Sequence, residues 1–180
     1  MTFRKARLSD TDSIMEIIAQ AKAQMKSRGS MQWQGPYPAR ENIEKDIDAG
    51  YGYVLCDSSG ITAYAAIIAE PEQAYMQIDG NWLCDGSYIV VHRLAVHDRA
   101  KNRGVATRLM TLAEGIGRST GQESIRADTS FDNEFMLRML GKLGFAYCGR
   151  IIYDSGVRMA FEKPLAATSS PDTAAPYRQE

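Results

Sequence analysis

The residues best suited to chemistry lie in a short basic loop at positions 101–106. Lys101 and Arg103 carry positive charge, and Gly104 precedes an amphipathic run that begins at Val105. The first turn of a helix has unpaired backbone N–H groups and the positive end of the helix dipole, so it attracts an anion. Glycine lets the backbone approach a ligand closely. The segment therefore predicts a phosphate-binding strand–loop–helix, with an ordinary basic helix cap as the alternative.

A second candidate for chemistry is His92, in the apolar run that precedes this loop. Val90 and Leu94 share its face of the predicted strand. An imidazole with an ordinary pKa of about 6.5 can remove a proton from an amine near neutral pH. His92 is thus a candidate base, and the alternative is a strand histidine with a structural hydrogen bond. We expect His97 to cap the loop.

The elements that must position these residues follow from hydrophobic periodicity and from Gly and Pro punctuation. Apolar residues at helical spacing predict helices over 14–25, 41–48, 105–116 and 136–143. Period-two or continuous apolar runs predict strands over 3–7, 53–56, 61–69, 88–96, 124–129, 147–153 and 157–161. Segments 29–38 and 70–86 are expected to be irregular.

Composition limits the classes of function that the chain can have. A length of 180 residues predicts one domain, which we place at 1–163, with a disordered Ala/Thr/Ser/Pro tail at 164–180. The formal net charge of −1 gives no support for nucleic acid as a partner. We find no signal peptide and no membrane-length apolar run, so a cytoplasmic protein is expected. Three dispersed cysteines and two histidines indicate reduced thiols and no metal site.

Two motifs carry a resemblance to a known family. Lys101-x-x-Gly104-x-Ala106 resembles the pyrophosphate loop of the GNAT acyltransferases. The later segment from Asn133 to Leu143-Gly144-Phe145 is similar to the family's Asn-led helix. The resemblance covers residues 1–163 and implies an α/β (α+β) GNAT fold. Its sheet is central, mixed and mostly antiparallel, is splayed beside the strand 88–96, and is flanked by helices.

The resemblance also implies a donor site for acetyl-CoA, the co-substrate of the family. The strand would pair through its backbone with the pantetheine arm, the loop and helix start would hold the diphosphate, and the later asparagine would add a contact. The implied cofactor-binding residues are Leu94, Ala95, Val96, Lys101, Asn102, Arg103, Gly104, Val105, Ala106, Thr107 and Asn133.

The implied reaction is acetyl transfer to a primary amine by direct attack in a ternary complex. The segment from His92 to His97 resembles the strand of serotonin N-acetyltransferases whose first histidine is assigned to proton removal. Many GNATs place a proton-donating tyrosine where this chain has Leu140. We therefore assign thiolate protonation to Tyr153, with water or another tyrosine as alternatives.

Acceptor binding is predicted on the loop between the first two helices. Trp33 and Tyr37 offer aromatic faces there, and Asp79 and Asp85 could add charge for a cationic amine. The acceptor is expected to be a small amine or a peptide, and a homodimer stays open. Rival interpretations are a non-catalytic acyl-CoA sensor and an acyltransferase that uses a longer acyl donor or a protein amine.

Overall fold

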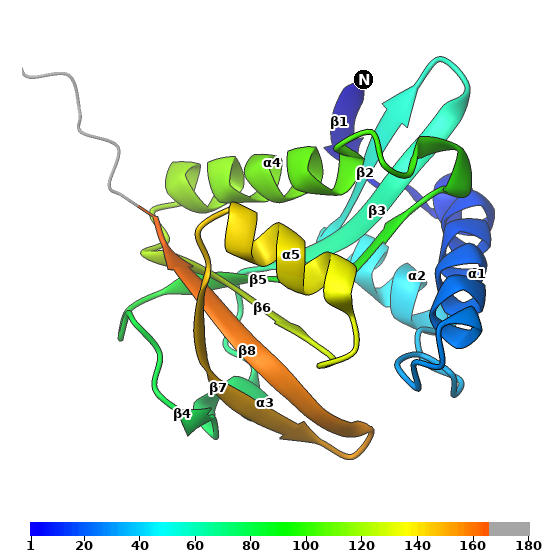
Figure 1. The fold of residues 1–180 in the computed structure, drawn as a ribbon. Helices are drawn as coiled ribbons and strands as arrows, with labels where there is room; N and C mark the ends of the chain where they lie inside the picture. Colours follow the sequence, from blue (N-terminus) through cyan, green and yellow to red (C-terminus); the bar gives the residue numbers. More distant parts are fainter. Residues whose placement is uncertain (166–180) are drawn as a thin grey trace, which may run out of the picture.

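The computed structural model describes residues 1–165, which are organised around one eight-stranded sheet (Figure 1). The strands lie in the order β1-β2-β3-β5-β6-β8-β7-β4, and only β5 and β6 are parallel neighbours. This confirms the expected mixed, mostly antiparallel sheet. The strands are β1 (Thr2–Lys5), β2 (Gly52–Asp57), β3 (Gly60–Ile68), β4 (Asp79–Gly80), β5 (Tyr88–Val96), β6 (Ser124–Thr129), β7 (Ala146–Tyr153) and β8 (Gly156–Pro164).

The four helices expected from periodicity are all present, with small shifts at their ends. Segment 70–86, which was predicted to be irregular, also holds a one-turn helix and a two-residue strand, so that prediction was wrong. Elements this short show no periodicity, and tertiary contacts stabilise them: Trp82 Nε1, for example, donates a 2.9 Å hydrogen bond to the carbonyl of Tyr75. The helices are α1 (Thr11–Ser27), α2 (Arg40–Asp48), α3 (Gln73–Met76), α4 (Val105–Ser119) and α5 (Glu134–Lys142).

Alternation along the strands places two sets of helices on opposite faces of the sheet. Val54 and Tyr64 pack in one buried cluster with Ile14 of α1 and with residues of α2. Their chain neighbours Leu55 and Ala63 pack in another cluster with residues of α4. Thus α1 and α2 cover one face, and α4 and α5 cover the other (Figure 1).

The sheet opens between β5 and β6, as expected for a splayed sheet. Parallel pairing joins Tyr88–Val90 to Ser124–Arg126 and stops there, although β5 continues along β3 as far as Val96. Close to the point of separation, β5 is bulged: Arg93 has a φ of 56°, and its register against β3 shifts. A bulge adds a residue to one strand and bends it. The backbone of β5 beyond Val90 is therefore free of a β6 partner.

Disorder was expected from residue 164, but the first two residues of that tail are ordered. β8 extends to Pro164, and Leu165 is buried against Gly117 and Ile89. Residues 166–180 lie outside the described part of the chain. Among residues 1–165, the longest helix is too short and too polar to cross a membrane.

Candidate functional site

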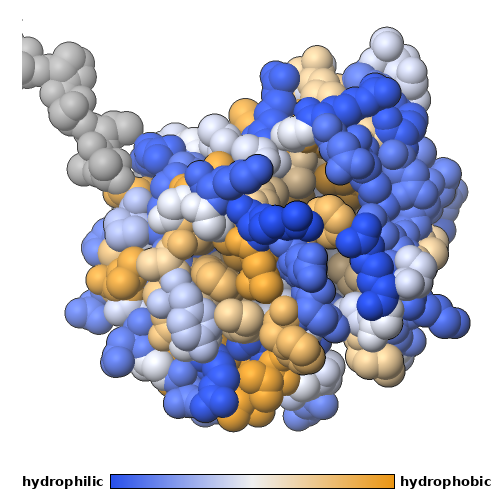
Figure 2. Space-filling view, in the orientation of Figure 1, coloured by the Kyte–Doolittle hydropathy of each residue, from blue (hydrophilic) through white to orange (hydrophobic). Residues whose placement is uncertain are grey.

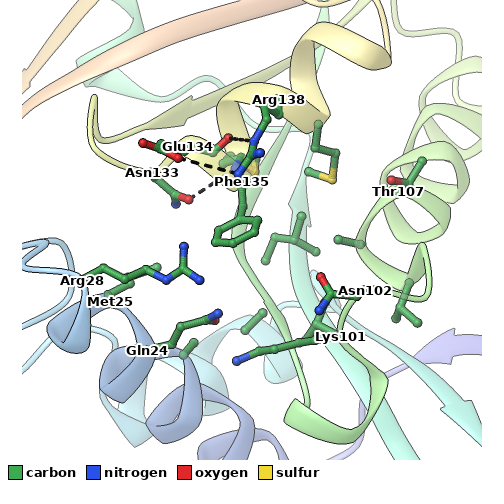
Figure 3. Close-up of a pocket in the computed structure, with 18 of the residues that line it drawn as sticks. Gln24, Met25, Arg28, Lys101, Asn102, Thr107, Asn133, Glu134, Phe135 and Arg138 are labelled. Carbon is green, nitrogen blue, oxygen red and sulfur yellow. Dashed lines mark hydrogen bonds and ion pairs between the residues drawn. The ribbon is translucent and has the colours of Figure 1, made fainter.

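A cavity of about 810 Å³ lies where the donor site was predicted, between α1, β5, α4 and α5 (Figure 3). In the space-filling view it is a hollow with hydrophilic residues on its rim and apolar residues deeper inside (Figure 2). Of the eleven residues predicted to hold the donor, ten line this cavity, and Arg103 does not. We call it the donor cavity.

The start of α4 forms one wall of the donor cavity. Gly104 is the N-cap in the left-handed region, with a φ of 71°, and Asn102 also has a positive φ. The first helical hydrogen bond runs from Arg108 N to the carbonyl of Gly104, so the preceding N–H groups have no partner within the helix. A Cβ on Gly104 would meet no atom within 4 Å, so the glycine is required by its backbone conformation rather than by space.

Polar side chains beside this loop already have partners within the chain. Lys101 Nζ forms an ion pair with Asp98, and His97 Nδ1 accepts the backbone N–H of Arg99 at 3.2 Å. His97 therefore caps the turn Asp98–Ala100, as predicted. The backbone N–H groups at the start of α4 are therefore the groups of this loop best placed to bind an anion.

The start of α5 forms the opposite wall. Asn133 caps the helix by accepting the Met136 N–H at 3.3 Å, and its Nδ2 donates to Gln32 at 3.3 Å. The guanidinium groups of Arg28 and Arg138 lie 4.2 and 5.2 Å from the ring centroid of Phe135 (Figure 3). Arg28, which follows α1, and Arg138 on α5 therefore add positive charge that suits a phosphorylated ligand, although Glu134 on the same rim pairs with Arg138 at 3.7 Å.

A second cavity of about 980 Å³ adjoins the first, and we call it the acceptor cavity. Its lining includes all four residues predicted for catalysis and acceptor binding, namely His92, Tyr153, Trp33 and Tyr37. The two cavities share four lining residues: Met25, Leu94, Asn133 and Met136. They therefore meet beside Leu94, at the opening between β5 and β6.

His92 lies in a network of partly buried polar side chains. Glu72 Oε2 accepts the Nε2–H of His92 at 2.6 Å, and Glu72 Oε1 accepts the hydroxyl of Tyr153 at 2.9 Å. Burial alone would raise the pKa of Glu72, but the hydrogen bond and charge of His92 and the hydrogen bond of Tyr153 bring it below the ordinary value. A carboxylate can only accept, so this contact leaves the lone pair of neutral His92 on Nδ1.

Asp128, on β6, faces His92 from across the strand opening. Its Oδ1 lies 3.8 Å from His92 Nδ1 and accepts the hydroxyl of Tyr75 at 2.7 Å. The hydroxyl of Tyr153 lies 3.5 Å from the same oxygen. Burial, with Asp128 nearby, raises the pKa of Tyr75 well above its ordinary value, so this phenol stays protonated.

The bulge on β5 also places Arg93 in the acceptor cavity, on the same side as His92. Arg93 donates to Asp46 Oδ1 at 3.1 Å, and the hydroxyl of Tyr64 donates to Asp46 Oδ2 at 2.7 Å. Burial raises the pKa of Asp46, and the positive charge of Arg93 opposes that rise. The same guanidinium lies 5.4 Å from the ring of Tyr37.

The structure corrects the predicted charges of the acceptor site. Asp79 and Asp85 do not line the acceptor cavity, and Asp79 forms an ion pair with Arg150 on β7 instead. The two carboxylates nearest to His92 are Glu72 and Asp128, which the sequence analysis missed. Asp128 could have been found, because continuing the parallel register beyond Val90 and Arg126 brings it opposite His92. Glu72 lies in an irregular segment and gave no such signal.

Leu140 and the three cysteines lie outside both cavities. Leu140, which stands where the tyrosine would be, is fully buried in the core under α4. None of the three cysteines, all in the described part of the chain, lines either cavity. Cys148 is buried, and burial raises the pKa of its thiol. The described residues contain no group of three or more side chains able to hold a metal ion.

Comparisons with known proteins agree with this geometry. The chain is 25% identical to the uncharacterized N-acetyltransferase YesJ of Bacillus subtilis over 162 residues. The aligned region covers 88% of this chain and 87% of YesJ. A GNAT-family acetyltransferase structure from Streptococcus agalactiae is 35% identical and covers 91% of this chain and 94% of its own, with a TM-score of 0.82.

YncA of Salmonella typhimurium, solved with its cofactor acetyl-CoA, shares the fold at a TM-score of 0.68 and 18% identity, over 97% of this chain and 99% of its own. The model of the acetyltransferase (GNAT) family matches residues 16–145. The chain therefore belongs to the GNAT family of acetyltransferases.

Proposed function

We propose that the protein is an N-acetyltransferase that moves an acetyl group from acetyl-CoA to a primary amine by direct attack in a ternary complex. The observation that carries this proposal is the meeting of the two cavities at Leu94. A donor that enters along β5 and an acceptor beside His92 would contact each other at this point. Family membership supports acetyl transfer as the chemistry.

The residues of the donor cavity fit acetyl-CoA. Beyond Val90, the backbone of β5 has no β6 partner and can pair with the amides of a pantetheine arm. The N–H groups at the start of α4 and the arginines on the rim suit its phosphates. YncA, which shares the fold, binds the same compound. When bound, acetyl-CoA supplies an activated thioester.

The reaction needs one group that takes a proton from the acceptor nitrogen and one that gives a proton to the thiolate. The bond from the acceptor nitrogen to the carbonyl carbon forms, and the bond from that carbon to sulfur breaks. The nitrogen gives up a proton, for which Nδ1 of His92 is the proposed acceptor. The leaving thiolate takes up one proton, so the products are an amide and free CoA.

Tyr153 remains the proposed proton donor for the thiolate. Burial, with Asp128 and Glu72 nearby, raises its pKa, so the phenol keeps its proton at neutral pH. Its hydroxyl now donates to Glu72, and a water molecule on that network is the alternative donor. A Tyr153→Phe variant separates the two: direct donation predicts a loss of roughly 10²-fold in kcat, whereas donation by water predicts a rate near wild type.

Thiol release from acetyl-CoA, measured across a panel of amines, amino acids and peptides, tests the proposed activity. We expect initial-rate plots for the two substrates to intersect, because both must be bound for direct attack. Parallel plots would indicate a covalent acetyl-enzyme and contradict the proposal. A Cys148→Ala variant should retain turnover, since the thiol is outside both cavities. Longer acyl-CoA compounds in the same assay test the donor preference.

A non-catalytic acyl-CoA sensor is the second candidate, and the presence of Leu140 in place of the family's tyrosine favours it. A chain with no tyrosine at that position has lost a common proton donor while it keeps the donor cavity. The sensor reading predicts that acetyl-CoA raises the melting temperature but that no amine releases thiol. Measurable turnover with any amine would exclude it.

A further inference from the structure

Three largely buried carboxylates lie in the acceptor cavity, and they differ in the hydrogen-bond partners of their oxygens. Asp46 is bonded at both oxygens, to Arg93 and to Tyr64, so its charge is balanced by a guanidinium. Glu72 is also bonded at both oxygens, to His92 and to Tyr153. Each oxygen of these two carboxylates therefore already has a partner within the chain.

Asp128 is different, although its side chain is only 10% exposed. Within residues 1–165, the hydroxyls that approach it reach Oδ1 alone: Tyr75 donates to Oδ1 at 2.7 Å, and the hydroxyl of Tyr153, which donates to Glu72, lies 3.5 Å from it. Oδ2 accepts none of these bonds. It also keeps some contact with solvent, because it is absent from the set of fully buried polar atoms that have no partner. It therefore opens into the cavity that Asp128 lines. A carboxylate oxygen that is largely removed from water and has no partner of its own can accept a charge-assisted hydrogen bond from an ammonium.

We propose that Asp128 binds the acceptor as a protonated primary alkylamine, at Oδ2 and beside Nδ1 of His92. This inference rests on the proposed function and names the class of acceptor that the site takes. An ammonium bound there lies next to the lone pair that Glu72 leaves on Nδ1. The ammonium loses two protons in the reaction. His92 takes the first and passes it to solvent, which frees the nitrogen lone pair for attack. The second leaves the nitrogen after the new bond forms, and it balances the proton that the thiolate takes up. Asp128 contacts the substrate, and Glu72 is a positioning residue that fixes the histidine tautomer.

The inference has a clear consequence for selectivity. Amines that are neutral at pH 7, such as aniline, gain nothing from Asp128 before attack. Alkylamines, which are charged at pH 7, are held by an ion pair and deprotonated in place. The site should therefore prefer the charged class in binding, before any chemistry takes place.

Binding of benzylamine and of its neutral isostere benzyl alcohol, measured by calorimetry on wild type and Asp128→Asn, tests this. Wild type should bind benzylammonium at least about tenfold more tightly than the alcohol, because charge-assisted hydrogen bonds are the stronger ones. Asp128→Asn should remove that preference and leave alcohol binding unchanged. The side-chain oxygen of asparagine can still accept from Tyr75, and a retained thermal shift with acetyl-CoA verifies the fold of the variant.

Asp79→Asn is the matched control, because it makes the same change in net charge outside both cavities and should keep the preference. Equal binding of the two ligands by wild type would overturn the inference, as would a preference that survives Asp128→Asn. This readout does not need turnover. A protein that binds benzylammonium through Asp128 but acetylates no amine would contradict the proposed function and leave the inference standing.

Discussion

The donor and acceptor cavities adjoin, yet they are built in different ways. Most of the predicted donor contacts come from one continuous stretch, residues 94–107, and its ligand groups are largely backbone N–H groups. The acceptor cavity instead collects side chains from distant segments, among them Glu72, His92, Asp128 and Tyr153. Each of these side chains is bonded to another from a different element.

This difference predicts unequal sensitivity to substitution. A backbone site keeps its ligand groups when a side chain changes, provided that the new residue can adopt the same conformation. A buried side-chain network loses a partner with every truncation and leaves another group unsatisfied. Single changes should therefore act strongly in the acceptor cavity. In the donor cavity, they should act strongly only where they alter the backbone.

The largest effect is expected from His92→Ala. If His92 removes the amine proton, kcat should fall roughly 10²–10⁴-fold, and the acidic limb of the rate–pH profile should disappear. Acetyl-CoA binding, followed by calorimetry, should stay unchanged because the donor cavity is intact. His97→Ala is the control and should keep its rate, since His97 lines neither cavity. An unaltered rate and profile in His92→Ala would transfer the role to water or to Asp128.

A smaller loss, of stability, is expected from Arg93→Gly. Glycine accepts the φ of 56° without strain, so the change removes the side chain, with its guanidinium, and does not strain the backbone. It leaves Asp46, whose side chain is 7% exposed, without its cation. Breaking a buried pair costs about 3–5 kcal/mol, and the relieved backbone offsets part of this, so we expect a loss of about 2–3 kcal/mol in chemical denaturation.

Arg99→Ala is the comparison for that experiment. Its pair with Asp57 is more exposed, with side-chain exposures of 32% and 29%, so its loss should cost at most about 1 kcal/mol. Equal losses in the two variants would mean that the Arg93 pair gives no more stability than a surface contact. Adding Asp46→Asn to Arg93→Gly should recover part of the loss, because no unpaired charge then remains.

The same contrast explains what could be predicted from the sequence. The strand 88–96, the basic loop and the helix from Val105 are contiguous, so local patterns were enough to find the donor site. His92 was found because it shares that strand. Glu72 and Asp128 were missed because their roles depend on contacts between segments far apart in sequence. The bulge at Arg93, which turns two successive side chains toward the acceptor, has no local signal such as a glycine.

In the donor cavity, the sharpest break should come from Gly104→Val. A branched residue held at a φ of 71° is strained by about 1–3 kcal/mol, although its Cβ meets no other atom. If the loop relaxes, its N–H groups turn away, and acetyl-CoA should bind about 10–100-fold more weakly by calorimetry. Gly121→Val tests backbone strain alone, since Gly121 has a φ of 72° and equal space at the far end of α4. Wild-type affinity in Gly104→Val would refute the loop assignment.

The smallest effect is expected from Lys101→Ala, although Lys101 leads the motif that identified the loop. Its ammonium already pairs with Asp98, so its charge is partly compensated before any ligand arrives. Its backbone conformation is extended, with a ψ of 154° before the helix, and alanine adopts it without strain. Exposed ion pairs contribute about 0–1 kcal/mol, so acetyl-CoA affinity should fall by no more than about fivefold. Arg103→Ala, outside the cavity, is the baseline. A loss for Lys101→Ala as large as that for Gly104→Val would show that side chains, not the backbone, hold the diphosphate, and the contrast between the two cavities would fail.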